Sequence, residues 1–355
     1  MNSAYDSDIS SGGKNNKFPG VTVVVPCRNE RRFIEPFLRS LLKQDYPREK
    51  TEIIIADGMS DDGTREIVRS YSARDQRIKM VDNPGKIVST GLNKAILESR
   101  NDIIIRMDTH TEYSSNYISK CVDALIQSGA GNVGGPARTK TRNFMQGAIA
   151  AAYHSPFAVG NASFHFVDFE GEVDTVTYGC WYKETLIKIG LFDEELVRNQ
   201  DDELNLRLQK SGYKIWQNPD IKSWYYPRES LKKLFKQYYQ YGYWKVWVIR
   251  KHRRPASLRQ LVPAAFVLAT LVSLCASIFF PVMRIGLIPV FVPYLIFISA
   301  GSVITAKRSN WRYLPVLPVI FATFHFGYGL GFLHGLMAQL LRKHKHSGAV
   351  TDLSR

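Results

Sequence analysis

Apolar and polar positions alternate in blocks through the first third of the chain. Apolar, mostly β-branched residues dominate the segments 21–25, 53–56 and 103–107, which is typical of strands buried on both faces of a sheet, and a further short strand is predicted at 78–81. The segments between these runs carry helical patterns, at 31–44, 65–73 and 87–98. Because strands and helices alternate, the sequence predicts an α/β fold with a doubly wound, mostly parallel sheet and right-handed crossovers.

The last quarter of the chain contains three long stretches without charge, at 261–283, 285–306 and 313–341. Each is long enough to cross a bilayer, so we expect about three transmembrane helices in a membrane region at 259–341. Three crossings would leave the basic tail at 342–355 on the outer side, against the positive-inside rule. Either the third stretch is a hairpin or re-entrant element, or the rule fails here.

Basic residues mark the border between the two parts. Residues 229–258 combine apolar residues at helical spacing with interleaved lysines, which predicts a basic amphipathic helix on the membrane surface. The basic residues just before the first apolar stretch are Arg250, Lys251, Arg253, Arg254 and Arg259. They should lie on the cytoplasmic side of a multi-pass protein of the cytoplasmic membrane, together with a folded domain at 20–228. Residues 1–19 are rich in Ser, Gly and Asn and are expected to form a disordered tail.

The formal net charge of +15 implies an anionic partner, namely nucleic acid, a phosphorylated substrate or acidic lipid. Because basic residues gather beside the apolar stretches, we expect membrane lipid as a partner and no nucleic acid. The four cysteines show no metal-type spacing and are expected to be free thiols in a reducing compartment.

Polar clusters follow three of the predicted strands, at 26–30, 57–62 and 108–110. In open α/β sheets, ligands bind beyond the carboxyl ends of the strands, so these clusters predict a nucleotide site. The chain lacks both the dinucleotide fingerprint and the phosphate loop, so phosphate must be held mainly by metal and by cationic side chains. Asp108 and His110 can point the same way from an extended chain and bind one divalent cation; a polar turn is the alternative.

Three of these segments resemble motifs of the family 2 inverting glycosyltransferases. They read Val-Val-Val-Pro-Cys-Arg-Asn-Glu at 23–30, Asp-Gly-Met-Ser-Asp-Asp-Gly-Thr at 57–64 and Met-Asp-Thr-His at 107–110. The chain is most similar to the succinoglycan-type, membrane-bound glucosyltransferases of exopolysaccharide biosynthesis, over about residues 20–250. The resemblance implies a GT-A-like catalytic domain, a nucleotide-diphospho-sugar donor and a divalent cation, Mn²⁺ or Mg²⁺.

The resemblance also implies roles for the residues on the donor side. The donor-binding residues would be Pro26, Arg28, Glu30, Asp57, Arg106 and Asp108. Pro26 and Glu30 would line the uridine pocket, and Asp57 would accept a hydrogen bond from uracil. Asp108 and His110 match the Asp-x-Asp metal motif of the family, in which most members carry a second Asp, and His favours manganese over magnesium. Asp57 as a turn acid and Glu30 as a helix N-terminal acid remain alternatives.

A run of acids precedes a short helical pattern at 199–208. Like charges repel, so one acid of the run is expected to titrate high. Aligned with the family pattern, Asp201 takes the place of the catalytic base, with Asp202 as the alternative. An acidic helix N-terminus is the structural alternative for the run.

Three aromatic residues are predicted to contact the acceptor, namely Trp181, Tyr241 and Trp244. A core position for Trp181 and membrane-interface positions for the other two are equally compatible with the sequence.

Together these features predict inverting transfer of a hexose to a lipid-linked saccharide in exopolysaccharide or cell-surface glycan synthesis. The expected hexose is glucose, and the expected donor is a UDP-sugar. One alternative is a processive polysaccharide synthase that extrudes its product; the absence of an Arg-Trp pair within 237–244 argues against it. The other is an inactive membrane scaffold with the same fold, which the intact acids Asp57, Asp108 and Asp201 disfavour.

Overall fold

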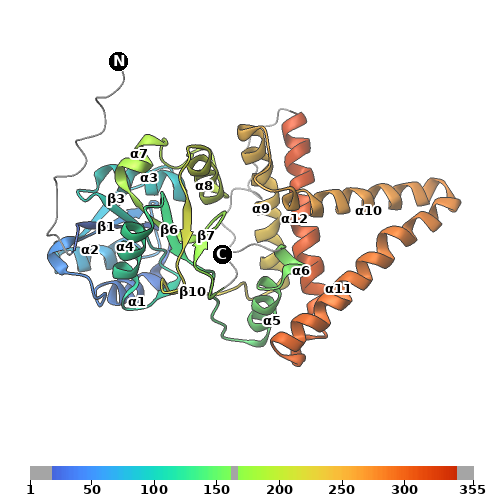
Figure 1. Ribbon diagram of the computed structural model, residues 1–355, viewed down its shortest axis with the longest axis horizontal. Helices are drawn as coiled ribbons and strands as arrows, with labels where there is room; N and C mark the ends of the chain where they lie inside the picture. The colour runs from blue at the N-terminus through green and yellow to red at the C-terminus, as the bar shows by residue number, and fades with distance from the viewer. Residues whose placement is uncertain (1–17, 161–166, 342–355) are drawn as a thin grey trace, which may run out of the picture.

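The computed structural model describes residues 18–160 and 167–341 and places an α/β domain beside a helical C-terminal part (Figure 1). The tail expected at 342–355 and nearly all of that expected at 1–19 lie outside the described residues. The chain forms the predicted mostly parallel sheet, in the order β3-β2-β1-β4-β8-β6-β9-β7.

The four predicted strands are β1 (Val21–Cys27), β2 (Thr51–Asp57), β3 (Ile78–Asp82) and β4 (Ile103–Arg106), all parallel to their neighbours in this group. The remaining strands of the sheet are β6 (Asn132–Gly135), β7 (Gly171–Glu172), β8 (Thr177–Tyr182) and β9 (Ile215–Gln217). Strand β8 runs antiparallel between β4 and β6. A separate two-stranded sheet pairs β5 (Thr111–Tyr113) with β10 (Ser223–Tyr225).

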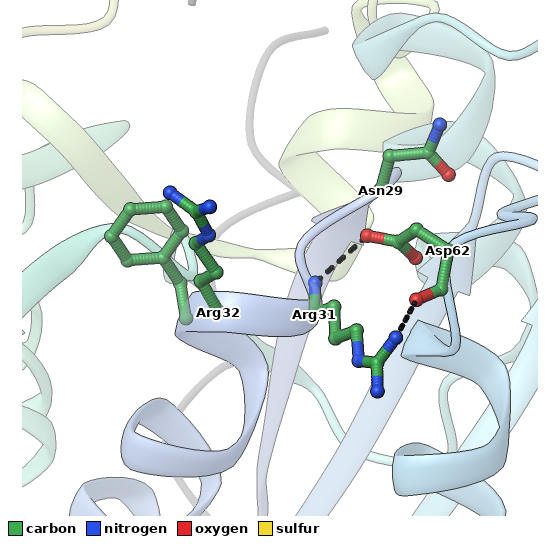
Figure 2. Close-up of a pocket in the computed structure, with 5 residues that line it drawn as sticks. Asn29, Arg31, Arg32 and Asp62 are labelled. Atoms are coloured by element: carbon green, nitrogen blue, oxygen red, sulfur yellow. Dashed lines mark hydrogen bonds between the residues drawn. The ribbon is translucent and has the colours of Figure 1, made fainter.

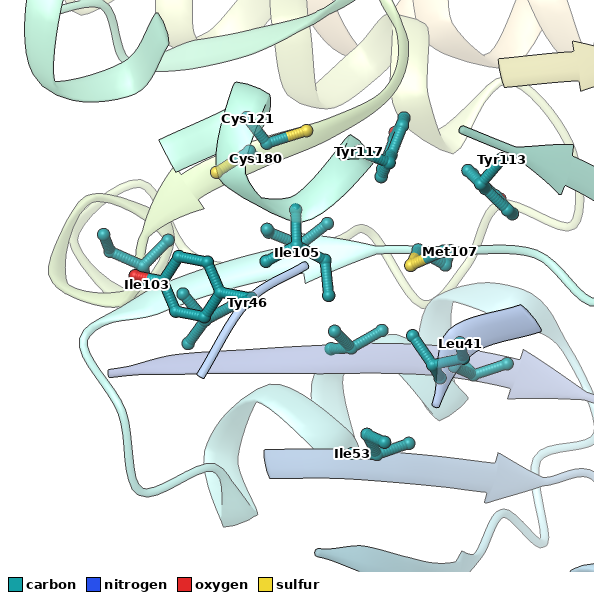
Figure 3. Packing of buried hydrophobic residues seen from close by; sticks show 14 of the residues in the cluster. Leu41, Tyr46, Ile53, Ile103, Ile105, Met107, Tyr113, Tyr117, Cys121 and Cys180 are labelled. Atoms are coloured by element: carbon teal, nitrogen blue, oxygen red, sulfur yellow. The ribbon is translucent and has the colours of Figure 1, made fainter. Parts of the chain in front are cut away.

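Helices cover both faces of the sheet because its central strands are apolar on both sides. One core packs residues such as Ile53 and Ile105 against Leu41 and Cys121 (Figure 3). The other joins alternate strand residues to Leu92 and Leu204. The helices of the domain are α1 (Arg31–Leu41), α2 (Thr64–Ser72), α3 (Val88–Glu98), α4 (Tyr117–Ser128), α5 (Phe144–Tyr153), α6 (Pro156–Val159), α7 (Lys183–Lys188) and α8 (Gln200–Lys210), with a 3₁₀ turn at Arg48–Lys50.

The C-terminal part consists of α9 (Leu231–His252), α10 (Val262–Phe279), α11 (Ile288–Arg308) and α12 (Leu317–Leu340). Short 3₁₀ turns at Leu258–Gln260, Pro281–Leu287 and Trp311–Tyr313 connect them. By length and composition, the last three helices could each span a membrane. The third apolar stretch is one continuous helix, so the hairpin alternative is wrong: Pro318 lies in the first turn of α12, where proline is tolerated.

Helix α9 lies between the α/β domain and α12 (Figure 1). Its middle is enclosed from both sides, and Tyr243 and Trp244 are buried. The expected helix therefore exists, but it does not present one apolar face and one wet face. A Cβ on Gly331 of α12 would lie 1.9 Å from the carbonyl oxygen of Tyr239, so the two backbones are in direct contact.

Candidate active site

The polar segments that follow β1 and β2 meet at one edge of the sheet. The two strands are paired in register up to Cys27 and Asp57. Beyond this pair, the backbone N–H of Asn29 donates to Ser60 Oγ over 2.8 Å, and that of Glu30 donates to Thr64 Oγ1 over 2.8 Å. The predicted convergence of these segments is thus present in the structure.

Asp57 is fully buried at this edge. Its Oδ2 accepts hydrogen bonds from the backbone N–H of Ser60 over 3.0 Å and from Arg65 Nη1 over 2.6 Å, and Arg65 also pairs with Asp82 over 2.7 Å. Within the described part of the chain, Asp57 Oδ1 has no hydrogen-bond partner although it is buried. Such an oxygen is costly unless a ligand supplies a donor, as the imide N–H of a uracil ring could.

The side chain of Arg28 packs closely over the loop after β2. Arg28 lies over Gly58, where an added Cβ would be 3.1 Å from Arg28 Cβ, and its guanidinium donates to the carbonyl oxygen of Lys86 over 3.4 Å. Pro26 is the penultimate residue of β1 and is half-buried. An open hollow adjoins this edge, lined by Asn29, Arg31, Arg32, Phe33 and Asp62. Figure 2 shows Arg31 joined to Asp62 by two hydrogen bonds, which fix the start of α1 to the loop after β2.

Arg106, at the end of β4, joins the donor side to the acidic run. Its Nε and Nη2 donate to the two oxygens of Asp108 over 2.9 and 3.1 Å, and its Nη1 donates to Asp201 Oδ1 over 2.5 Å. Burial alone would lower the pKa of Arg106, but the charges of Asp108 and Asp201 raise it above its ordinary value. Arg106 therefore stays cationic and holds two carboxylates from segments far apart in the chain at one point.

The three acids at the start of α8 have three different sets of partners. Asp201 pairs with Arg106, and Asp202 pairs with Lys245 of α9 over 2.7 Å. Glu203 is buried and accepts from Arg207 and His252, so it ties α8 to α9. Partial removal from water raises the pKa of Asp201; Arg106 opposes this, while Asp108 and Asp202 add to it. This agrees with the prediction that one acid of the run titrates high.

His110 lies close enough to Asp108 for the charge of that carboxylate to act on the imidazole. Burial lowers the pKa of His110, Asp108 opposes the shift, and the charges of Arg228, Arg106 and Arg198 add to it. A neutral imidazole and a carboxylate are suitable ligands for Mn²⁺. Among the described residues no group of three or more His, Cys, Asp or Glu could hold a metal ion, so the side chains supply only part of a coordination sphere. The residues fit a cation that takes its remaining ligands from a diphosphate and from water.

The aromatic residues predicted to contact the acceptor occupy unequal positions. Trp181 is 1% exposed and packs edge-on against Phe192 in the core between the sheet and α8. Trp244 is fully buried in the contact between α9 and the domain. Neither presents a face to a sugar, because both fill apolar space between layers. Tyr241 is half-buried, and its carbonyl oxygen accepts a hydrogen bond from Asn199, just before the acidic run.

Several residues that shape the site were not predicted from the sequence. Asn199 has a positive φ of 61° and starts α8 in a left-handed conformation, which is typical of constrained functional segments. Tyr178, with φ 63°, places its ring 5.9 Å from the guanidinium of Arg106. Lys245 lies within a basic helix, where nothing in the sequence distinguishes it from its neighbours. For Asn199, the sequence offered one signal, which is the position of an asparagine just before an acidic run.

The site thus combines a buried carboxylate oxygen without a partner among the described residues, an imidazole on which a nearby carboxylate acts, and a partly exposed carboxylate of raised pKa. Asp201 is 39% exposed and can meet a substrate from solvent. A carboxylate in this setting can accept a proton from a hydroxyl group.

The chain was compared with known proteins. The family model described as glycosyl transferase family 2 matches residues 22–183. A succinoglycan biosynthesis protein, ExoA, of Rhizobium meliloti (strain 1021) is 31% identical over 89% of this chain and 94% of its own length. A dolichyl N-acetyl-alpha-D-glucosaminyl phosphate 3-beta-D-2,3-diacetamido-2,3-dideoxy-beta-D-glucuronosyltransferase of Methanococcus voltae is 28% identical over 89% of this chain and 97% of its own.

Among solved structures, a mannosyltransferase of Pyrobaculum calidifontis, PcManGT, in complex with GDP-Man and Mn²⁺, aligns with a TM-score of 0.58. It is 19% identical and covers 92% of this chain and 88% of its own, which shows the shared GT-A-like fold. The identity and coverage of the succinoglycan protein, together with the family model and the strand-end motifs, lead to one conclusion: this chain is a glycosyltransferase of family 2.

Proposed function

We propose that this glycosyltransferase moves a hexose, with glucose as the first candidate, from a UDP-sugar to a lipid-linked saccharide in exopolysaccharide or cell-surface glycan synthesis. The observation that carries the proposal is Arg106, which joins Asp108 and Asp201 at the carboxyl edge of the sheet. One carboxylate lies on the expected diphosphate side and the other on the expected acceptor side. The resemblance to a succinoglycan biosynthesis protein supports the glycan class.

The expected chemistry is a direct displacement with inversion. Asp201 takes the proton of the acceptor hydroxyl as its oxygen attacks C1 from the face opposite the diphosphate. A single carboxylate suffices, because a nucleoside diphosphate leaves without prior protonation by a carboxylic acid. Arg106 orients Asp201 and keeps Asp108 in place beside the leaving group.

A divalent cation would be held by Asp108 and His110 and would supply positive charge to the departing diphosphate. The Mn²⁺ in the distant mannosyltransferase structure supports this choice. The catalytic domain would face the cytoplasm, as the basic residues before α10 suggest.

A donor screen tests the proposal. Purified full-length protein in lipid, a lipid-linked saccharide acceptor, Mn²⁺ and a panel of sugar nucleotides are combined, and released nucleoside diphosphate is measured. We expect turnover with a UDP-sugar and loss of at least ~100-fold of that turnover on adding a chelator, with recovery on adding excess Mn²⁺. Turnover that is insensitive to the chelator would contradict the roles of Asp108 and His110. Products longer than one added sugar would favour a processive synthase.

Asp57→Asn tests the uracil contact. The change removes the charge of the buried acceptor, so we expect KM for the UDP-sugar to rise by about 10- to 100-fold, with kcat changed by no more than a few-fold. Asp82→Asn is the matched control, because it removes the other partner of Arg65 without touching the proposed contact. Equal KM in both variants would refute the assignment.

A further inference from the structure

Helix α12 differs from the other two apolar helices in how much of it is covered by protein. Within its most apolar window, 44% of the residues are buried inside the molecule, against 17% in each of the other two. Figure 1 shows α12 running beside α9, while α10 and α11 project away on the side opposite the α/β domain. The molecule is therefore layered as domain, α9, α12 and then the α10–α11 pair.

The contact between α9 and α12 continues along several turns. The glycines Gly327, Gly331 and Gly335 approach the backbone carbonyl groups of Phe235, Tyr239 and Tyr243, in that order. Each step of four residues on one helix matches a step of four on the other, so the two helices run in the same direction and nearly side by side. They consequently have the same tilt relative to any membrane.

Both ends of α9 are fixed to the domain. Near its C-terminal end, Lys251 pairs with Asp193 over 2.7 Å, and in its middle Lys245 pairs with Asp202. Near its N-terminal end, Gln237 accepts a hydrogen bond from Arg228 over 3.0 Å. Charged side chains at both ends and in the middle would have to enter hydrocarbon if α9 crossed a bilayer, which is energetically unfavourable.

Both ends of α12 also reach the domain. Leu317, at its start, packs in one cluster with Ala148 of α5, and His325 lies 2.8 Å from the carbonyl oxygen of Phe157 in α6. Ala338, near its end, packs in one cluster with Leu196 and Val197 of the segment before α8. A helix of 24 residues is about 36 Å long. If it crossed a hydrocarbon core about 30 Å thick, one end would lie far from the domain.

Helices α10 and α11, in contrast, are covered by protein over only a small part of their length. Their buried residues lie in the half nearer to α12, from Ala264 to Thr270 on α10 and from Ile298 to Ala306 on α11, where Thr305 also donates to Ser155 Oγ beside α6 over 2.8 Å. The large apolar side chains around the turn between them are 57–76% exposed; they are Ile278, Phe279, Phe280, Val282, Ile285 and Ile288. The helices have 18 and 21 residues, or about 27 and 31 Å, which matches the hydrocarbon core. Basic residues lie at the base of the pair, and Arg284 lies at its tip.

We propose that the chain crosses the bilayer twice, through α10 and α11, and that α12 lies in the headgroup layer of the same face as the catalytic domain. The occupant of the exposed apolar surface is a lipid bilayer whose acidic headgroups meet the basic residues at the base of the pair. The chain then leaves α12 on the domain side, and the basic residues from Arg342 onward obey the positive-inside rule. The active-site carboxylate Asp202 is separated from this layer by α9 alone, so acceptors are taken from headgroup depth.

Single-cysteine labelling tests the number of crossings. In a Cys275→Ser background, cysteines replace Ser211 on the domain, Arg284 at the tip and Leu341 after α12, all of them exposed. Intact cells and inside-out vesicles are treated with a membrane-impermeant maleimide. We expect positions 211 and 341 to be labelled from one face and position 284 from the other. Labelling of 341 together with 284 would overturn the proposal, and so would labelling of all three from one face.

Depth measurements test the position of α12 and do not depend on catalytic activity. Nitroxide labels at Val319→Cys and Leu330→Cys, near the start and middle of α12, are compared with Val272→Cys in the middle of α10, in acidic-lipid vesicles. We expect both α12 labels at shallow, similar depth and the α10 label near the bilayer centre. A label at 330 as deep as that at 272 would show that α12 is a span.

Discussion

Asp201→Asn is expected to reduce kcat for sugar transfer by about 10³-fold while leaving KM for the donor within a few-fold. The reason is that the amide cannot take the proton of the acceptor hydroxyl, although it keeps the shape of the side chain and its hydrogen bond from Arg106. Steady-state release of nucleoside diphosphate in the presence of acceptor measures the effect, and donor binding to the variant verifies that the site is intact.

Asp202→Asn is the matched control, since Asp202 is engaged by Lys245 and should not act as the base. We expect its kcat to fall less than 10-fold. A larger loss in Asp202→Asn than in Asp201→Asn would assign the base to Asp202, and full activity in both would show that neither carboxylate is the base.

The pH profile separates a base from a merely structural carboxylate. Because the pKa of Asp201 is raised, it is protonated at pH values where an ordinary aspartate is ionised. Activity should therefore fall with decreasing pH earlier than an unperturbed carboxylate would cause, and this acid limb should vanish in Asp201→Asn.

Gly331→Ala is expected to destabilise the protein by about 2 kcal/mol, although alanine favours helices by about 1 kcal/mol over glycine. The added methyl group would meet the carbonyl oxygen of Tyr239 at 1.9 Å, so α12 and α9 must separate. We expect the midpoint of thermal unfolding to fall by about 5 °C in lipid nanodiscs.

Gly286→Ala is the control for this change. It lies in the turn between α10 and α11, where no atom comes within 4 Å of an added Cβ. Its unfolding midpoint should stay within about 1 °C of the parent. A midpoint in Gly331→Ala equal to that of the control would contradict the close contact of the two helices.

The sequence predicted the α/β domain well because its central strands are buried on both faces and therefore uniformly apolar. The runs around Val23, Ile54 and Ile104 are buried, as is typical of a parallel sheet covered on both faces. Strand β8 escaped prediction because its antiparallel insertion between β4 and β6 depends on pairing partners that are distant in the chain.

The positions of site residues could be predicted where they belong to a local sequence motif. They could not be predicted where the environment of a residue depends on tertiary packing. Asp57, Asp108 and Asp201 follow strands or begin a helix, so their positions relative to the sheet can be inferred. The environment of Trp181 and Trp244 depends on which layers close over them, and a single sequence does not contain that information. The roles of Lys245 and Asn199 arise only once α9 lies against α8.

The ties between α8 and α9 change where the working unit of this enzyme ends. Asp202 and Glu203 pair with Lys245 and His252 of α9, which lies beyond residue 228, the end of the catalytic domain predicted from the sequence. A fragment that ends at residue 228 would lack α9 and would expose two carboxylates whose basic partners lie on that helix. Any minimal version of the enzyme must therefore retain α9. Because α9 packs closely against α12, the candidate active site and the helices that could span a membrane form a single structural unit.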